Sequence, residues 1–329
     1  MSSLRDRLVW VIPQGAEAGA LGIVLGLTIV VAILLTGGQI LQWRSLEAMA
    51  YQLPLLGLFS LAQMVPMLTG GIDLSVVSSA NLCGIVAAYI LKAGWGATGV
   101  WLAIGSGLFA ALNVGILNGV LIARVGITPI IATLATMILI RGISLAVTRG
   151  TVLAGFPPEF LVLGSGSVIG IPVSTILVVC VSVGLWSLLT RTPFGVCVYL
   201  YGSNPIATHF SGVNTQRLLK RVYLCSSLLA GLAGLVMISR FNAAQADYGS
   251  SYLLLTVLVN VLGGVDPMGG AGSLGGVWAA LITLQLIATA FNLVGLSAHL
   301  ANAIWGGLLI GVLLLRAWLR GYPMTHLKP

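Results

Sequence analysis

Few side chains in this sequence could perform acid–base, nucleophilic or metal chemistry. The chain holds seven acidic residues and three histidines, and His209, His299 and His326 are far apart with no neighbouring carboxylate. A metal site needs several such ligands together, and a catalytic triad needs a base beside its nucleophile. The phosphate-binding motif GxxxxGK followed by Ser or Thr is also absent from the sequence. We therefore expect no enzyme activity, no metal site and no cofactor bound by this chain.

Asp73 is the best-placed residue for carrying a proton or a metal ion inside a membrane. It lies in the segment Thr69-Gly70-Gly71-Ile72-Asp73-Leu74-Ser75, between two apolar stretches. An ion-coupled carrier keeps carboxylates within its spans, and other acids in such positions are scarce here. Asp73 could equally cap the helix that follows Ser75. A self-sufficient secondary carrier that uses Asp73 is therefore the alternative function.

The composition indicates an integral membrane protein. Hydrophobic residues make up 58% of the 329 residues and charged residues 7%, with a mean hydropathy of +1.08. The net charge of +8 comes from Lys and Arg at the ends of apolar stretches, so it reports membrane topology and does not predict nucleic-acid binding. Cys83, Cys180, Cys197 and Cys225 lack metal-ligand spacing and are expected to pack as small apolar residues.

Uncharged stretches of roughly membrane-spanning length follow one another along the chain. They predict an all-α polytopic membrane protein, a single permease-like domain over 1–329 with about ten transmembrane helices. Thr128 is expected to cap the fifth helix, with Pro129 in its first position. The Gly-Gly pairs predict broken or re-entrant segments. The expected spans are 18–42, 48–72, 76–91, 93–123, 129–147, 160–190, 222–239, 252–265 and two within 267–315.

The distribution of basic residues predicts the orientation. An even number of spans puts both termini on one side, and with that side in the cytoplasm ten Lys and Arg residues lie inside and five do not, as the positive-inside rule requires. The five that do not lie inside are Arg44, Lys92, Arg141, Arg149 and Arg240. Of these, Arg141 falls within the fifth span, where its side chain either snorkels outward to the membrane surface, which we favour, or has a functional role.

The basic, turn-rich loop at 200–221 is expected to face the cytoplasm. Asn204 can cap a short helix whose first position is Pro205, and Gly212 can end it. A chain without its own energy source needs an external motor, so this helix predicts a docking point for a soluble partner. An ordinary loop between two spans is the competing interpretation, and a non-transporting membrane scaffold is the competing class.

Four stretches resemble the permease subunits of ribose-type carbohydrate ABC importers, a group that also serves xylose, rhamnose and autoinducer-2. The first is the segment from Thr69 to Val76. The others are 128–142, with Thr128-Pro129 and Arg141-Gly142; 202–213, with Gly202-Ser203-Asn204-Pro205; and 262–270, with its two Gly-Gly pairs. In this order they extend the resemblance over most of the chain, from residue 69 to residue 270.

The resemblance implies a multi-pass protein of the bacterial inner membrane that translocates a monosaccharide or similar small polyol. It implies three partners: an ATPase subunit, which would bind ATP and Mg, a second permease subunit, and a periplasmic sugar-binding protein. It also makes the short helix a coupling helix seated in the ATPase. The coupling residues would be Gly202, Ser203, Asn204, Pro205, Ala207, Phe210, Ser211, Gly212 and Val213.

Sugars present hydroxyls and apolar ring faces, so uncharged hydrogen-bonding groups and aromatic rings suit their path. Each such residue could instead bond neighbouring helices. The candidates for the substrate path are Asp73, Ser75, Asn81, Asn113, Asn118, Thr128, Thr133 and Phe241.

Two departures from the family pattern suggest a specialised paralogue. Val77 stands where relatives usually carry glycine, and Leu253-Leu254-Leu255-Thr256 replaces a segment with an acidic pair. One half of a permease heterodimer is slightly favoured over a homodimer.

Overall fold

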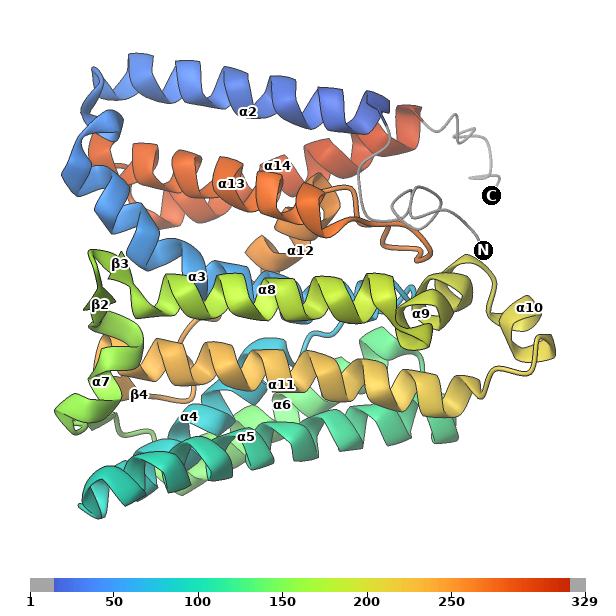
Figure 1. The fold of residues 1–329 in the computed structure, drawn as a ribbon, viewed down its shortest axis with the longest axis horizontal. Helices are drawn as coiled ribbons and strands as arrows, with labels where there is room; N and C mark the ends of the chain where they lie inside the picture. The colour runs from blue at the N-terminus through green and yellow to red at the C-terminus, as the bar shows by residue number, and fades with distance from the viewer. Residues whose placement is uncertain (1–14, 320–329) are drawn as a thin grey trace.

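The computed structural model describes residues 15–319, which form a mostly helical protein (Figure 1). The described residues also include a 3₁₀ turn, η1 (Gln39–Leu41), and a π-helical turn, η2 (Leu121–Val125). The α-helices are α2 (Gly15–Thr36), α3 (Trp43–Met67), α4 (Val76–Lys92), α5 (Gly96–Val120), α6 (Pro129–Thr148), α7 (Pro158–Ser165), α8 (Val173–Arg191), α9 (Pro193–Ser203), α10 (Pro205–Phe210), α11 (Thr215–Phe241), α12 (Tyr252–Leu262), α13 (Leu274–Val294) and α14 (Ala298–Leu319).

Two pairs of very short antiparallel strands connect helices at one end of the molecule. Strand β1 (Leu153–Ala154) pairs with β4 (Ala243–Ala244), and β2 (Ser167–Val168) pairs with β3 (Ile171–Pro172). Helix α7 and the β2–β3 hairpin lie at the opposite end of the molecule from α10 (Figure 1). The first described residue of α2 and the last of α14 lie at the α10 end, whereas Arg5, Arg7, Arg320 and Lys328 fall outside the described residues.

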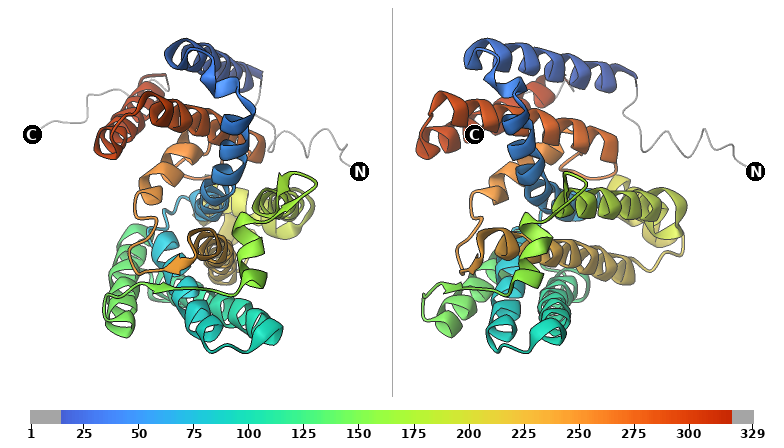
Figure 2. Two further views of the ribbon diagram at one scale, coloured as in Figure 1. Left: turned by 90° about the vertical axis from the view of Figure 1, so that its left-hand side faces the viewer. Right: turned by 60° about the vertical axis from the view of Figure 1, so that its left-hand side comes forward.

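Helix α11 lies at the centre and packs against α3, α4 and α5. Small residues allow this close approach: Gly234 faces the backbone of Ala80, and Gly115 faces Ser227 of α11. Helices α2, α13 and α14 group on one side of the core, and α4, α5 and α6 group on the other (Figure 2). Among the long apolar helices, α3 and α11 are the two most buried, so they form the core of the bundle.

Among residues 15–319, six helices are long and apolar enough to cross a membrane: α3, α5 with its π turn, α6, α8, α11 and α13. Shorter apolar helices cover 22–36, 76–92, 252–262 and 299–312. Large apolar side chains such as Trp101 and Phe109 are exposed on the surface, as lipid contact requires. The chain is a helical multi-pass membrane protein, and its total of about ten spans stays a prediction.

Several expected boundaries were wrong. Helix α3 begins at Trp43, so Arg44 lies in its first turn instead of separating two spans. The sixth span was expected from residue 160, but Phe160 belongs to α7, and α8 begins only at Val173. Gly166, Gly170 (φ 78°) and Pro172 interrupt the helical pattern between them, because glycine and proline favour turns.

The central helix α11 also begins earlier than residue 222. Asn214 caps it, with Oδ1 accepting a hydrogen bond of 2.9 Å from the backbone N of Arg217. Arg217, Lys220 and Arg221 therefore lie inside the helix instead of in the loop before it. Helix α9 was not expected at all, and it carries the chain from α8 directly into α10.

Candidate functional site

Helix α10 is a six-residue helix that projects from one end of the fold (Figure 1). Asn204 Oδ1 accepts a hydrogen bond of 2.9 Å from the Ala207 backbone N, and Pro205 occupies the first helical position. Gly212 follows with a φ of 82°, a left-handed conformation that favours glycine. The side chains of Ile206 and Phe210 are 71% and 84% exposed. The predicted cap, proline and stop are all confirmed, and the helix exposes the apolar side chains of Ile206 and Phe210.

Three segments meet immediately behind α10 through their backbones. We call Leu68, Gly70, Gly202, Gly269 and Gly270 the glycine junction. The Gly270 backbone N donates a hydrogen bond of 2.9 Å to the Leu68 carbonyl oxygen. A Cβ on Gly202 would overlap both that oxygen and the Gly270 nitrogen, and a Cβ on Gly269 would lie 2.6 Å from the Gly70 nitrogen. Only glycine fits at these close approaches.

The break between α3 and α4 contains a buried polar network centred on Asp73. Its Oδ1 accepts hydrogen bonds from the Ser75 backbone N (2.9 Å) and Oγ (2.6 Å), and its Oδ2 accepts one from Ser226 Oγ of α11 (2.9 Å). Asn118 of α5 donates to Ser75 Oγ at 2.7 Å. Ser75 is the N-cap residue of α4, so Asp73 braces that helix start and links three helices.

Further side chains hold the same break. Thr133 Oγ1 of α6 accepts a hydrogen bond from the Leu74 backbone N and donates to the Ile72 or Pro129 carbonyl oxygen. Gln63 of α3, with its amide turned to satisfy both partners, pairs with the backbone O and N of Asp73 at 2.8 and 3.1 Å. The break is thus a fixed structure inside the helix bundle and satisfies most of its polar groups.

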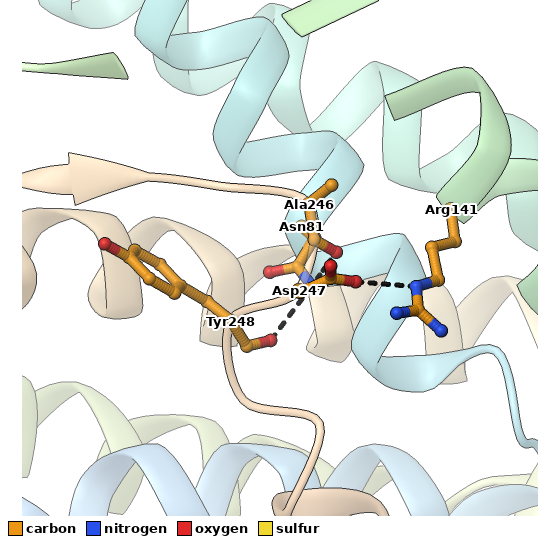
Figure 3. A network of polar contacts seen from close by, with 5 residues as sticks. All are labelled: Asn81, Arg141, Ala246, Asp247 and Tyr248. Atoms are coloured by element: carbon orange, nitrogen blue, oxygen red, sulfur yellow. Dashed lines mark hydrogen bonds and ion pairs between the residues drawn. The ribbon is translucent and has the colours of Figure 1, made fainter. Parts of the chain in front are cut away.

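A second cluster of side chains holds the loop between β4 and α12, and we call Asn81, Arg141, Asp247 and this loop the loop clasp (Figure 3). Asn81 Nδ2 donates to the carbonyl oxygens of Ala246 (2.8 Å) and Tyr248 (2.9 Å). Arg141 Nε lies 2.6 Å from Asp247 Oδ1, with side chains that are 58% and 40% exposed. Arg141 therefore has a defined ionic partner across the bundle.

Comparisons with known proteins identify the family. A family model described as "Branched-chain amino acid transport system / permease component" matches residues 45–315. The chain is 35% identical over 298 residues to the ribose import permease protein RbsC of Bacillus subtilis, covering 89% of this chain and 92% of that protein. It is 30% identical over 268 residues to the autoinducer 2 import system permease protein LsrD of Klebsiella pneumoniae, covering 80% of each.

The chain belongs to the permease family of ribose-type ABC importers. A match of 34% identity to the ribose import permease of Escherichia coli K12, over 70% of this chain and 73% of that one, agrees. No solved structure matches the chain. The relatives are transport permeases and not enzymes. Membership in an importer family implies an ATPase and a binding protein as partners.

The permease brings only some of the predicted path residues together. Asp73, Ser75 and Asn118 form one hydrogen-bonded group, and Thr133 contacts the same break. Asn81 lies in the loop clasp, where Phe241 stacks edge-on against Tyr248 with ring centroids 5.6 Å apart.

Two of the predicted path residues lie elsewhere. Asn113 is exposed and bonds to Phe109 O of its own helix. Thr128 is exposed and makes no side-chain cap bond, although Pro129 does begin α6 as expected.

Sequence reasoning missed three residues of this permease that share the Asp73 site. Gln63 and Ser226 bond Asp73, and the Tyr223 hydroxyl lies next to Gly71. Tyr223 Oη and Asn118 Oδ1 are buried and have no hydrogen-bond partner within the described part of the chain. Polar residues inside otherwise apolar spans were the available signal, but only the fold shows that they converge.

Proposed function

We propose that this permease carries a monosaccharide or a similar small polyol across the bacterial inner membrane. Relatives that match most of the chain are import permeases for ribose, which supports a small hydroxylated solute. A periplasmic sugar-binding protein would deliver it, and a second permease subunit would complete the pathway. A heterodimer is slightly favoured, since the acid-free segment 253–256 departs from the pattern of relatives.

The exposed apolar helix α10 is the observation that carries the coupling proposal. The Asn204 cap helps to hold this short helix, and exposed side chains such as Phe210 provide apolar area for burial against a partner. We infer that α10 seats in the ATPase subunit, where ATP and Mg would be bound. The coupling surface would comprise Gly202, Ser203, Asn204, Pro205, Ala207, Phe210, Ser211, Gly212 and Val213.

The solute path is proposed to pass the polar residues gathered near Asp73 and in the loop clasp. Both carboxylate oxygens of Asp73 already accept hydrogen bonds from serines, and the relatives are subunits of importers. Both observations favour the importer over the alternative of an ion-coupled carrier that works alone through Asp73.

Changing the exposed surface of α10 tests the coupling proposal. Phe210→Ser should leave membrane insertion unchanged but reduce co-purification of the ATPase subunit and abolish ATP-driven uptake in vesicles. Ile169→Ser is the matched control, because Ile169 is 98% exposed in the β2–β3 turn at the opposite end. Normal ATPase binding by Phe210→Ser, or solute accumulation by vesicles that contain only this chain, would contradict the proposal.

A further inference from the structure

The glycine junction connects α10 to the Asp73 network through a continuous series of backbone contacts. Asn204, the cap of α10, directly follows α9, and Gly202 lies in the last turn of that helix. Gly202 touches the carbonyl oxygen of Leu68, the residue that ends α3. Five residues after Leu68 comes Asp73. Backbone contacts therefore lead from the end of α9, next to α10, to the start of the buried break.

The loop at 263–273 forms the third component of the junction and is held in a single shape. Its Asp266 backbone N bonds to the Ala271 carbonyl oxygen, and its Gly269 N bonds to the Asp266 oxygen, both at 2.9 Å. Tyr199 of α9 donates from its hydroxyl to the Gly272 carbonyl oxygen at 3.0 Å. The loop therefore clamps the end of α9 against the end of α3.

Backbone contacts transmit displacement differently from side-chain contacts. A flexible side chain can change rotamer when one element moves, whereas two backbones in van der Waals contact must move together or separate. Gly70, Gly269 and Gly270 also have φ values of 76°, 93° and 79°, which only glycine adopts readily. At Gly70, Gly202 and Gly269 the nearest neighbours are therefore all backbone atoms, which have no rotamers to adjust.

We infer that Gly202 and Gly269 are positioning residues that transmit the movement of α10 to the α3–α4 break. This inference rests on the proposed coupling function of α10. In the assembled importer, displacement of α10 by the ATPase moves Leu68 and the turn through Ser75 together with it. The bonds of Ser75 and Ser226 to Asp73 then carry the displacement into α4 and α11.

The test uses the assembled importer in lipid vesicles, with Cys83, Cys180, Cys197 and Cys225 replaced and Leu74→Cys as a reporter in the break. The probe is a membrane-permeant maleimide. The rate at which it labels Cys at position 74 is compared between the nucleotide-free and the ATP-bound complex. We expect ATP to change this rate severalfold, and Gly269→Ala to abolish the change while the ATPase subunit stays bound and hydrolyses ATP.

Gly275→Ala is the matched control, because a Cβ there meets nothing within 4 Å and the residue lies only five positions beyond Gly270. It should keep the response to ATP. Tyr199→Phe removes one hydroxyl without adding volume, so it should fold and weaken the response even if Gly269→Ala does not assemble. A full response in either junction variant would overturn the inference. Failure of the unmodified chain to bind the ATPase would overturn the proposed function itself.

Discussion

The two ends of helix α12 are held in different ways. The loop before it is held by side chains, through Asn81 and the Arg141–Asp247 ion pair. The loop after it is held chiefly by backbone against backbone at the glycine junction, with one further hydrogen bond from the Tyr199 hydroxyl to Gly272 O. Side chains can change rotamer when a neighbouring element moves, but backbone atoms in contact cannot adjust in this way. If α10 moves, we therefore expect the loop clasp to deform more than the glycine junction.

Backbone conformation shows the same difference. Arg149, Ile169 and Asn242 are the described non-glycine residues with positive φ, and none belongs to the junction. Ile169 lies in the β2–β3 turn, Asn242 directly precedes β4, and Arg149 ends α6 shortly before β1. Asn242 adopts a φ of 48° although it carries a side chain. That side chain contributes a hydrogen bond, because its Oδ1 accepts from the Phe156 backbone N at 2.9 Å. At the junction the same left-handed conformation is available only to glycine.

The largest predicted effect is that of Gly270→Ala. Left-handed backbone costs a residue with a Cβ about 1–2 kcal/mol, and a Cβ here would also lie 2.8 Å from the Ser203 backbone N. We expect a lower thermal unfolding midpoint in detergent and little folded protein. Gly307→Ala in α14, where a Cβ meets nothing, should be neutral or slightly stabilising. If Gly270→Ala and Gly307→Ala have equal unfolding midpoints, tight backbone contact does not hold the loop after α12, and the contrast with the loop clasp is lost.

The next effect is that of Asn81→Leu at the loop clasp. It removes two hydrogen bonds, to Ala246 O and Tyr248 O, at about 1 kcal/mol each. Faster amide hydrogen exchange confined to residues 243–251 is the expected result. Asn113→Leu serves as control, because Asn113 bonds only within its own helix. Unchanged exchange in the loop would show that the clasp does not depend on Asn81.

Asn204→Ala should have a smaller and local effect. Loss of the N-cap costs about 1 kcal/mol, and it would fray α10 without changing the unfolding midpoint of the bundle. Solute transported per ATP hydrolysed should fall, and Asn204→Asp should restore it because Asp keeps the accepting oxygen. If the solute transported per ATP hydrolysed is the same in the two variants, the geometry of α10 does not determine coupling.

The smallest effect is expected for the Arg141–Asp247 pair. Both side chains are substantially exposed, and exposed pairs contribute about 0.2–1 kcal/mol. A double-mutant cycle with Arg141→Gln and Asp247→Asn, measured by thermal unfolding, should give a coupling energy in that range. A coupling energy above about 2 kcal/mol is beyond the usual range for exposed pairs. It would show that side chains hold the loop clasp as firmly as backbone contacts hold the glycine junction.

Local rules were enough to predict the details of α10 and the proline that begins α6, although Thr128 makes no side-chain cap bond there. Caps, proline positions and glycine stops depend on a few neighbouring residues, so Asn204, Pro205 and Pro129 could be assigned from their order in the chain. The same rules failed at 160–173, because an apolar stretch does not reveal whether it forms one span or a short helix followed by a hairpin.

Composition and motif order by themselves determined the membrane class, the family and the short capped helix, since these depend on hydrophobicity and on local hydrogen bonding. Tertiary structure alone decided which distant residues meet: Asp73 with Ser226, Arg141 with Asp247, and Gly202 with Gly270. The reason is physical. Such contacts form between segments that are remote in sequence, and only the packing of whole helices brings their atoms within bonding distance.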